Sequence, residues 1–350
     1  MARVDLTVRG GGIFGLSIAW AAARRGARVR LIETHAIGAG ASGGLVGALA
    51  PHVPDQWNPK KAFQLQSLLM MADWWEQVAR ASGLACGYAA TGRLQPLPDD
   101  AAVTIARHRE TSARDLWQGR ARWQVIAAPG TLWQPASATG LLVYDTLSAR
   151  INPRMALAAL VAAVQARRGE VVVGNAPEAG PVIWATGVAG LAALSQDRGA
   201  SGGDGVKGQA LSLRFHAPDA PQIFVDGLHI VPHQDGTVAI GSTSENHWND
   251  PVSADDQLET LLTKARAALP ILADAPVVER WAALRPRATT RAPLLGPWPG
   301  RPGHFIANGG FKIGFGVAPL VAQVMADLVL DGRDRIPPGC GTDWLATPAR

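Results

Sequence analysis

The chain has 350 residues, of which 47% are hydrophobic and 17% are charged, so it can bury a sizeable core and is long enough for two compact domains. This composition excludes a disordered chain, a collagen-like chain and a small disulfide scaffold. The net charge is +5, but 28 of the 33 basic residues are arginines spread along an Ala- and Gly-rich sequence. A biased genomic base composition explains this usage as well as an acidic partner does, and we expect no nucleic-acid partner.

The two cysteines, Cys86 and Cys340, lie far apart and form no CxxC pair. This spacing excludes a disulfide framework, a cysteine-ligated zinc site and a thioredoxin-like motif, and it favours a reducing, cytoplasmic setting. We expect no metal site.

The weakly polar run at residues 10–23 has the apolar character of a signal-peptide core. It begins with three glycines, is too short to span a bilayer, and is followed by Arg24 and Arg25 where a cleavage site would need small residues. No other stretch reaches the length of a membrane helix, so we expect no transmembrane segment.

The first 33 residues follow the order strand, glycine-rich turn, helix, strand. Residues 4–8 are short and β-prone, and residues 10–15 read GGGIFG, which has the spacing G-x-G-x-x-G. Residues 13–25 predict a helix that ends at Gly26, and residues 27–32 predict a second strand. This order is typical of a dinucleotide-binding βαβ unit.

Each residue of this motif has a physical role in such a site. Gly10 allows the tight turn, Gly12 lets the backbone approach a pyrophosphate, and Gly15 lets the helix touch the sheet, while the helix N-terminus attracts phosphates. Glu33, at the end of the second strand, would accept hydrogen bonds from both ribose hydroxyls. The predicted contacts in this segment are Gly10, Gly12, Ile13, Phe14, Gly15, Glu33 and Thr34.

A second glycine-rich segment, GAGASGG at residues 38–44, follows almost at once and continues into GALAP at 47–51. NAD enzymes usually need no such loop. Here the sequence resembles the D-amino-acid oxidase superfamily of flavoenzymes, in particular its glycine oxidase and sarcosine oxidase branch. In that branch a G-A-S-G loop lies along the FAD diphosphate and the isoalloxazine edge. The resemblance implies FAD as the cofactor, with Ala41, Ser42 and Ala48 among its contacts.

The resemblance extends over nearly the whole chain. The matching segments are VIWATG at 182–187, VKGQ at 206–209, HIVP at 229–232, AIGST at 239–243, WAALRP at 281–286, PLLGP at 293–297 and GGFKIGFGVAP at 309–319. Several motifs in the family's order identify the chain as a member. The further cofactor contacts that this implies are Ala185, Gly187, Arg285, Gly310, Phe311, Lys312, Ile313 and Gly314.

Residues 309–319 also point to flavin chemistry without the family. Small or bendable positions precede a predicted helix whose first turn contains Pro319, and apolar periodicity continues through Leu320 and Val324. The N–H groups at this helix start would stabilise the negative charge that hydride addition to N5 leaves on the N1 and C2=O edge. The alternative is that the glycines only permit close packing.

The order of the motifs predicts an α/β protein with a Rossmann-like FAD-binding domain and an inserted antiparallel β-sheet substrate domain, a glutathione-reductase-like FAD fold. The predicted FAD-binding domain comprises 1–80, 141–205 and 276–350, and the substrate domain comprises 81–140 and 206–275. Strands of the substrate sheet are expected at 88–97, 141–145, 208–215, 223–232 and 237–242, and helices at 62–81, 153–168 and 255–268. Between residues 173 and 181 the chain allows only a brief turn where the family carries a β-hairpin.

Three side chains are the predicted catalytic residues, because the flavin takes the hydride and the protein must orient the substrate. Arg285 occupies the family's carboxylate-binding position, and a guanidinium fixes a carboxylate plane with two parallel N–H bonds. His229 stands where glycine oxidases commonly have a tyrosine; it would hydrogen-bond the carboxylate or shuttle the amine proton, or it is a core histidine. Lys312 replaces a residue that is often arginine and would assist with the carboxylate or pair with the flavin.

The resemblance implies an FAD-dependent oxidoreductase that converts the C–N bond of a small amino acid or secondary amine to an imine, which then hydrolyses. Neither cysteine matches the position of covalent flavin attachment in sarcosine oxidases, so FAD is expected to be noncovalent. Whether oxygen, a quinone or another carrier reoxidises the flavin stays open, as does a homo-oligomer.

Two alternatives are a flavin domain of the tRNA-modifying type, normally fused to a methyltransferase domain that this sequence does not contain, and a flavin-binding subunit of a multisubunit dehydrogenase.

Overall fold

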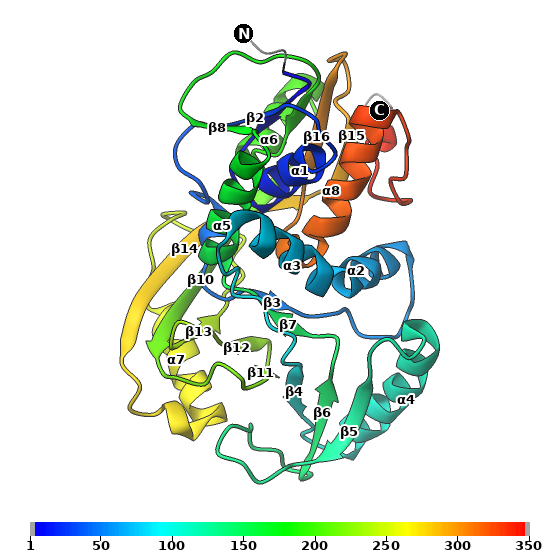
Figure 1. Ribbon diagram of the computed structural model, residues 1–350. Coiled ribbons are helices and arrows are strands. Elements are labelled where there is room, and N and C mark those ends of the chain that lie inside the picture. The colour runs from blue at the N-terminus through cyan, green and yellow to red at the C-terminus, as the bar shows by residue number, and fades with distance from the viewer. Residues whose placement is uncertain (1–3, 347–350) are drawn as a thin grey trace.

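The computed structural model describes residues 4–346, which form two main β-sheets stacked one above the other in Figure 1. The first three and last four residues of the predicted FAD-binding segments lie outside this range. A short third sheet between them pairs β3 Ala48–Leu49 with β7 Ala149–Arg150. The two-sheet architecture confirms the predicted fold class.

The six-stranded sheet has the order β15-β16-β9-β1-β2-β8. Its strands are β1 Leu6–Arg9, β2 Val29–Glu33, β8 Glu170–Val173, β9 Val182–Trp184, β15 Leu294–Pro297 and β16 His304–Asn308. All neighbours pair in parallel except β15 with β16. The carboxyl ends of β16, β9, β1 and β2 therefore lie at one edge, where parallel sheets bind ligands.

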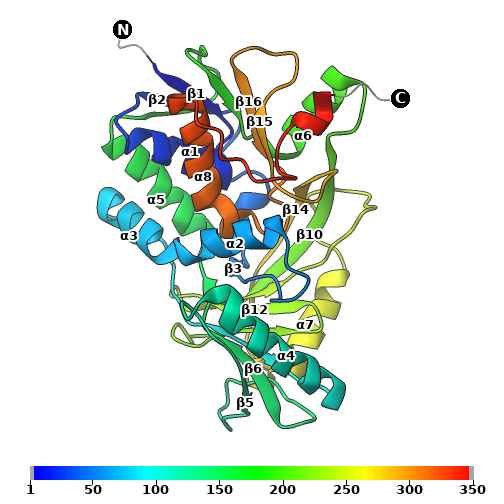
Figure 2. The same cartoon turned by 90° about the vertical axis from the view of Figure 1, so that its right-hand side faces the viewer.

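Helices cover both faces of this sheet, as Figure 2 shows. One face carries α1 Ile13–Ala23, α5 Pro153–Ala166 and α8 Gly314–Asp331, and the other carries α6 Gly187–Arg198. Every residue of α1 is buried, because the sheet, α5 and α8 surround it.

The helix predicted at 62–81 is two helices, α2 Pro59–Leu69 and α3 Met71–Ser82, separated at Met70. Their apolar faces pack beside α1, α5 and α8 in the same core. Because the sequence is apolar on both sides of Met70, its periodicity predicted one continuous helix.

Two sequence-based statements about α8 were wrong: the position of its start, and the statement that no other stretch reaches the length of a membrane helix. The helix begins at Gly314, so Pro319 lies inside it rather than in its first turn. With 18 residues, α8 is long and apolar enough to cross a membrane by length and composition, and 61% of that window is buried within the fold. The predicted start of the helix was too late because the prediction assigned Gly314 and Gly316 to the preceding loop.

The larger sheet has eight strands in the order β14-β10-β13-β12-β11-β4-β6-β5. Its strands are β4 Arg93–Pro96, β5 Trp123–Ala127, β6 Leu141–Asp145, β10 Gly203–Arg214, β11 Gln222–Val225, β12 Leu228–Pro232, β13 Thr237–Gly241 and β14 Val277–Ala288. It is antiparallel as predicted, apart from one parallel pair, β11 with β4. The predicted strand at 223–232 is a hairpin, because Asp226 and Gly227 both adopt positive φ.

The predicted domain bounds do not coincide with the change of sheet. Strands β6 and β14 belong to the eight-stranded sheet, although the bounds 141–205 and 276–350 assigned them to the FAD-binding domain. Strand β14 was not predicted, and it pairs with β10 over almost its whole length. The chain therefore leaves the larger sheet after Ala288, not near residue 276.

The two faces of the larger sheet differ in character. One face is apolar, with Leu211, Ile230 and Ile240 packed beneath α7 Gln257–Ala268. On the opposite face, α4 Asp100–Trp117 packs on β5 at the far end of the sheet. That same face approaches the glycine-rich loop, since a Cβ on Gly241 would lie 2.6 Å from a methyl group of Val46. The remaining short elements are η1 Ala41–Gly43, η2 Pro270–Leu272 and η3 Asp343–Ala346.

Candidate cofactor and substrate site

The turn between β1 and α1 leaves no room for side chains. Gly10 has φ +108°, and a Cβ there would lie 2.3 Å from the carbonyl oxygen of Ala185 at the end of β9. A Cβ on Gly15 would lie 1.9 Å from the carbonyl oxygen of Gly10. Strand, turn and helix thus approach one another through backbone atoms, which only glycine permits.

The first amide N–H groups of α1 have no carbonyl acceptor within the helix. The Ile13 N–H donates to the Ser42 hydroxyl at 3.0 Å, which ties the second glycine-rich loop to the helix N-terminus. Glu33 accepts the Gly11 N–H at 2.6 Å and the His35 N–H at 2.9 Å. The carboxylate is therefore held beside the turn at the end of β2.

The start of α8 lies next to the start of α1. A Cβ on Gly310 would lie 3.0 Å from the Phe14 ring, and one on Gly314 would lie 3.7 Å from the Ile13 side chain. Phe311, between them, has φ +41°. Two positive helix ends therefore meet at the carboxyl edge of the sheet, a geometry that favours anionic groups.

The arrangement fits a dinucleotide such as FAD. It offers free helix N-terminal amides, a carboxylate for ribose hydroxyls, and space, because a Cβ on Gly40 or Gly187 would meet no atom within 4 Å. All but one of the cofactor residues predicted from sequence lie at the turn after β1, the end of β2, η1, β3, the β9–α6 turn or the β16–α8 turn. These are Gly10, Gly12, Ile13, Phe14, Gly15, Glu33, Thr34, Ala41, Ser42, Ala48, Ala185, Gly187, Gly310, Phe311, Lys312, Ile313 and Gly314. The exception, Arg285, lies on β14 of the larger sheet.

Arg285 extends from β14 over the polar face of the larger sheet. Arg285 is only 9% exposed, and among residues 4–346 the one hydrogen-bond acceptor that it contacts is the Thr243 carbonyl, 3.0 Å from Nη1. A Cβ on Gly208 would lie 1.7 Å from Nη1, so this glycine makes room for the guanidinium. Burial lowers the pKa of Arg285 to about 10, an effect that the nearby Glu245 carboxylate partly offsets.

Glu245 belongs to a buried polar network under the same strands. It accepts hydrogen bonds from Gln209 Nε2, at 3.0 Å, and from the Thr243 hydroxyl, and its carboxylate lies 3.9 Å from Lys207 Nζ. Lys207 also pairs with Asp255 at 3.1 Å. Because Lys207 is the ion-pair partner of Glu245, Arg285 keeps a charge without a carboxylate ion pair among the residues that the structure describes.

Lys312 and His229 contribute to the same region. Burial and the charge of Arg285 lower the pKa of Lys312, whose Nζ lies 5.6 Å from the centre of the Phe311 ring. Burial, together with the charges of Arg93 and Lys312, lowers the pKa of His229 to about 3. The buried Nδ1 of His229 has no hydrogen-bond partner in the described part of the chain. His229 is therefore neutral at physiological pH and is a weak proton acceptor.

Two charged residues on this face were missed by sequence reasoning. Arg93 on β4 donates from Nε to Asp145 on β6 at 2.9 Å, and both side chains are buried. The Arg93 guanidinium lies 5.6 Å from the centre of the Phe224 ring, which itself lies 4.7 Å from the His229 ring. The available signal was one charged residue in each predicted strand, Arg93 within 88–97 and Asp145 at the end of 141–145. The sequence pattern could not show that these strands are neighbours.

Comparison with known proteins places this geometry in a family. Residues 5–328 match the family described as FAD dependent oxidoreductase, DAO. The chain belongs to this family. It is therefore an FAD-dependent oxidoreductase, as the two glycine-rich segments and the resemblance predicted.

Individual relatives agree with this assignment. Glycine oxidase of Pseudomonas putida is 26% identical, with 95% of this chain and 96% of that protein covered. The bifunctional protein ThiO/ThiG of a Nostoc strain is 27% identical over 93% of this chain, and the chain spans about half of its length. The crystal structure of glycine oxidase from Geobacillus kaustophilus has the same fold, with a TM-score of 0.83, 23% identity and 100% and 99% of the two chains covered.

Proposed function

We propose that this protein oxidises the C–N bond of a small amino acid or secondary amine to an imine, which hydrolyses to an oxo-acid and an amine. The observation that carries the proposal is Arg285, a buried guanidinium with a single protein acceptor on the sheet face that approaches the glycine-rich loop. A buried cation without a carboxylate partner is suited to an anionic ligand. The similar proteins named glycine oxidase support an amino acid as that ligand.

In this proposal the protein orients and the cofactor reacts. FAD supplies the hydride acceptor, N5. Arg285 binds the substrate carboxylate and fixes its plane, and Lys312 adds a second positive charge beside Arg285. The neutral His229 donates or accepts a hydrogen bond; its low pKa favours this role over proton shuttling.

The helix starts at Ile13 and Gly314 would hold the diphosphate and stabilise negative charge at the far edge of the flavin. FAD is proposed to bind without a covalent link. Both cysteines are buried, and burial raises the pKa of Cys86 and of Cys340 to about 11, so neither is a ready thiolate. We also propose that oxygen accepts the electrons of the reduced flavin, since similar proteins are named oxidases. We further propose a cytoplasmic location.

The test is substrate-dependent bleaching of the flavin. Purified protein is expected to be yellow and to release FAD on denaturation in acid. Under anaerobic conditions glycine, sarcosine and small D-amino acids should reduce the flavin, and matched amines without a carboxylate should not. Bleaching by neither the amino acids nor the amines would overturn the proposal. Equal bleaching by the amines would overturn the role of Arg285 as the anchor of a substrate carboxylate.

A further inference from the structure

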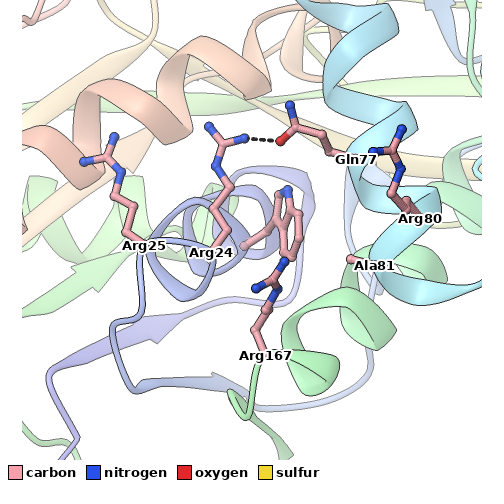
Figure 3. Close-up of a pocket in the computed structure, with 7 residues that line it drawn as sticks. Arg24, Arg25, Gln77, Arg80, Ala81 and Arg167 are labelled. Atoms are coloured by element: carbon pink, nitrogen blue, oxygen red, sulfur yellow. Dashed lines mark hydrogen bonds between the residues drawn. The ribbon is translucent and has the colours of Figure 1, made fainter.

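A second concave site lies at the opposite end of α1 from the cofactor turn. The ends of α1, α3 and α5 line an open cavity of about 530 Å³. Four arginines, Arg24, Arg25, Arg80 and Arg167, line it together with Gln77, as Figure 3 shows. Trp20 also lines it. At 1.5 Å per residue, the 11 residues of α1 separate this cavity from the dinucleotide turn by roughly 16 Å.

Two of the four arginines already have carboxylate partners. Arg25 Nη1 lies 2.8 Å from Asp327 and 3.5 Å from Asp331 on α8. Arg80 pairs with Glu76 one turn earlier on α3, at 2.5 Å. These two charges are compensated within the protein.

The other two arginines are not compensated by an ion pair. Arg24 donates to the neutral side-chain oxygen of Gln77 at 2.7 Å, and its guanidinium lies 5.1 Å from the centre of the Trp74 ring. Burial, and then the charge of Arg25, lower the pKa of Arg24, and the Asp73 carboxylate partly offsets this shift. The exposed Arg167 side chain makes no hydrogen bond or ion pair with any residue in the range 4–346. The cavity therefore presents two guanidinium groups that form no ion pair with the described residues.

We propose that this cavity binds a phosphate monoester. At neutral pH such a group carries about 1.5 to 2 negative charges and three acceptor oxygens, which match two guanidiniums that form no ion pair. A carboxylate would neutralise only one of the two charges. Small-molecule sites have volumes of roughly 300 to 1,000 Å³, so the cavity accommodates a phosphorylated metabolite rather than the phosphate alone.

Calorimetric titration of the FAD-loaded protein at fixed ionic strength tests the proposal, with ribose 5-phosphate as the probe. The double variant Arg24→Gln/Arg167→Gln should weaken binding on the order of tenfold for each guanidinium removed. The matched control Arg107→Gln/Arg114→Gln removes two exposed charges from α4 and should leave the affinity unchanged.

Vesicles of phosphatidylcholine with and without phosphatidic acid test whether a lipid headgroup supplies the same phosphate monoester. Binding of ribose 5-phosphate that depends on Arg24 and Arg167 supports a soluble ligand. Binding to phosphatidic acid vesicles alone, with the same dependence, assigns the headgroup. The proposal would be overturned if the Arg24/Arg167 double variant bound each probe as tightly as the Arg107/Arg114 control does, or if the parent protein bound neither probe. Either result would show that the arginines only offset three helix C-termini.

Because the single variant Arg167→Gln alters an exposed side chain without partners, it should fold normally and serves as the fallback if the double variant does not.

Discussion

The cofactor region and the substrate region are built by opposite means. The β1–α1 turn is shaped by close backbone packing, since a Cβ atom on Gly10 or Gly15 would lie within 2.3 Å of a carbonyl oxygen. On the polar face of the larger sheet it uses buried charged side chains, Arg93, Asp145 and Arg285. The cofactor region is thus sensitive to added atoms, and the substrate region is sensitive to removed charge.

The largest expected effect is on the substrate side. Arg285→Ala should leave FAD bound but lower the second-order rate of flavin reduction, because loss of one buried charge-assisted pair amounts to about 2 to 5 kcal/mol, or 30-fold to several thousand-fold. Rapid mixing with the best amino-acid substrate measures it. Arg280→Ala, an exposed change on the same strand, is the matched control. An unchanged rate in Arg285→Ala would leave Lys312 as the carboxylate anchor.

The next effect tests the backbone side of the comparison. Gly15→Ala places a methyl group 1.9 Å from the Gly10 carbonyl oxygen, and since both are backbone positions neither can rotate away. We expect a loss of stability of about 1 to 3 kcal/mol or more, and loss of bound FAD. Thermal unfolding of the FAD-free protein and the flavin-to-protein ratio report these. Gly40→Ala, where a Cβ meets no atom, should leave the unfolding temperature of the FAD-free protein unchanged.

A glycine on the substrate side should behave differently. Gly208→Ala places a methyl group 1.7 Å from Arg285 Nη1, but the guanidinium is the end of a flexible side chain and can move. The variant should fold and keep FAD, while its rate of flavin reduction falls on the order of tenfold. Combined with Arg285→Ala, the same change should have no further effect, since the clash is gone. Additive effects in the double variant would contradict this coupling.

The last effect concerns His229 and pH. Its pKa in the folded protein is about 3, against about 6.5 in the unfolded chain, so between these values only the unfolded chain binds the proton. The free energy of unfolding should therefore fall as pH decreases below 6.5, by up to about 1.4 kcal/mol per pH unit from this group. Denaturant titrations of the parent and His229→Phe at pH 4 to 7 measure the difference in slope. Parallel curves would show that His229 titrates normally when folded.

Sequence alone predicted the β1–α1 part of the cofactor region, because the groups of that part are local. The glycines, the helix start and Glu33 lie within 24 residues, and each requirement, positive φ, close approach or a free amide, belongs to one residue or its neighbours. The same holds for strand β6, where the predicted range and the structure agree at both ends. Helix α8 shows the limit of local reading, since glycines in its first turn hid its true start.

Tertiary structure decided the substrate region. Arg285 was placed by the resemblance, but its burial depends on Gly208 and Thr243, which come from two other strands. The ion pair of Arg93 and Asp145 joins residues 52 apart, and its position near His229 follows from the unexpected parallel pairing of β4 with β11. Strand order and burial are long-range properties, so a pattern of neighbouring residues does not contain them. The sequence determined which groups could react with or hold a cofactor, and only the fold determined which charges remain unpaired.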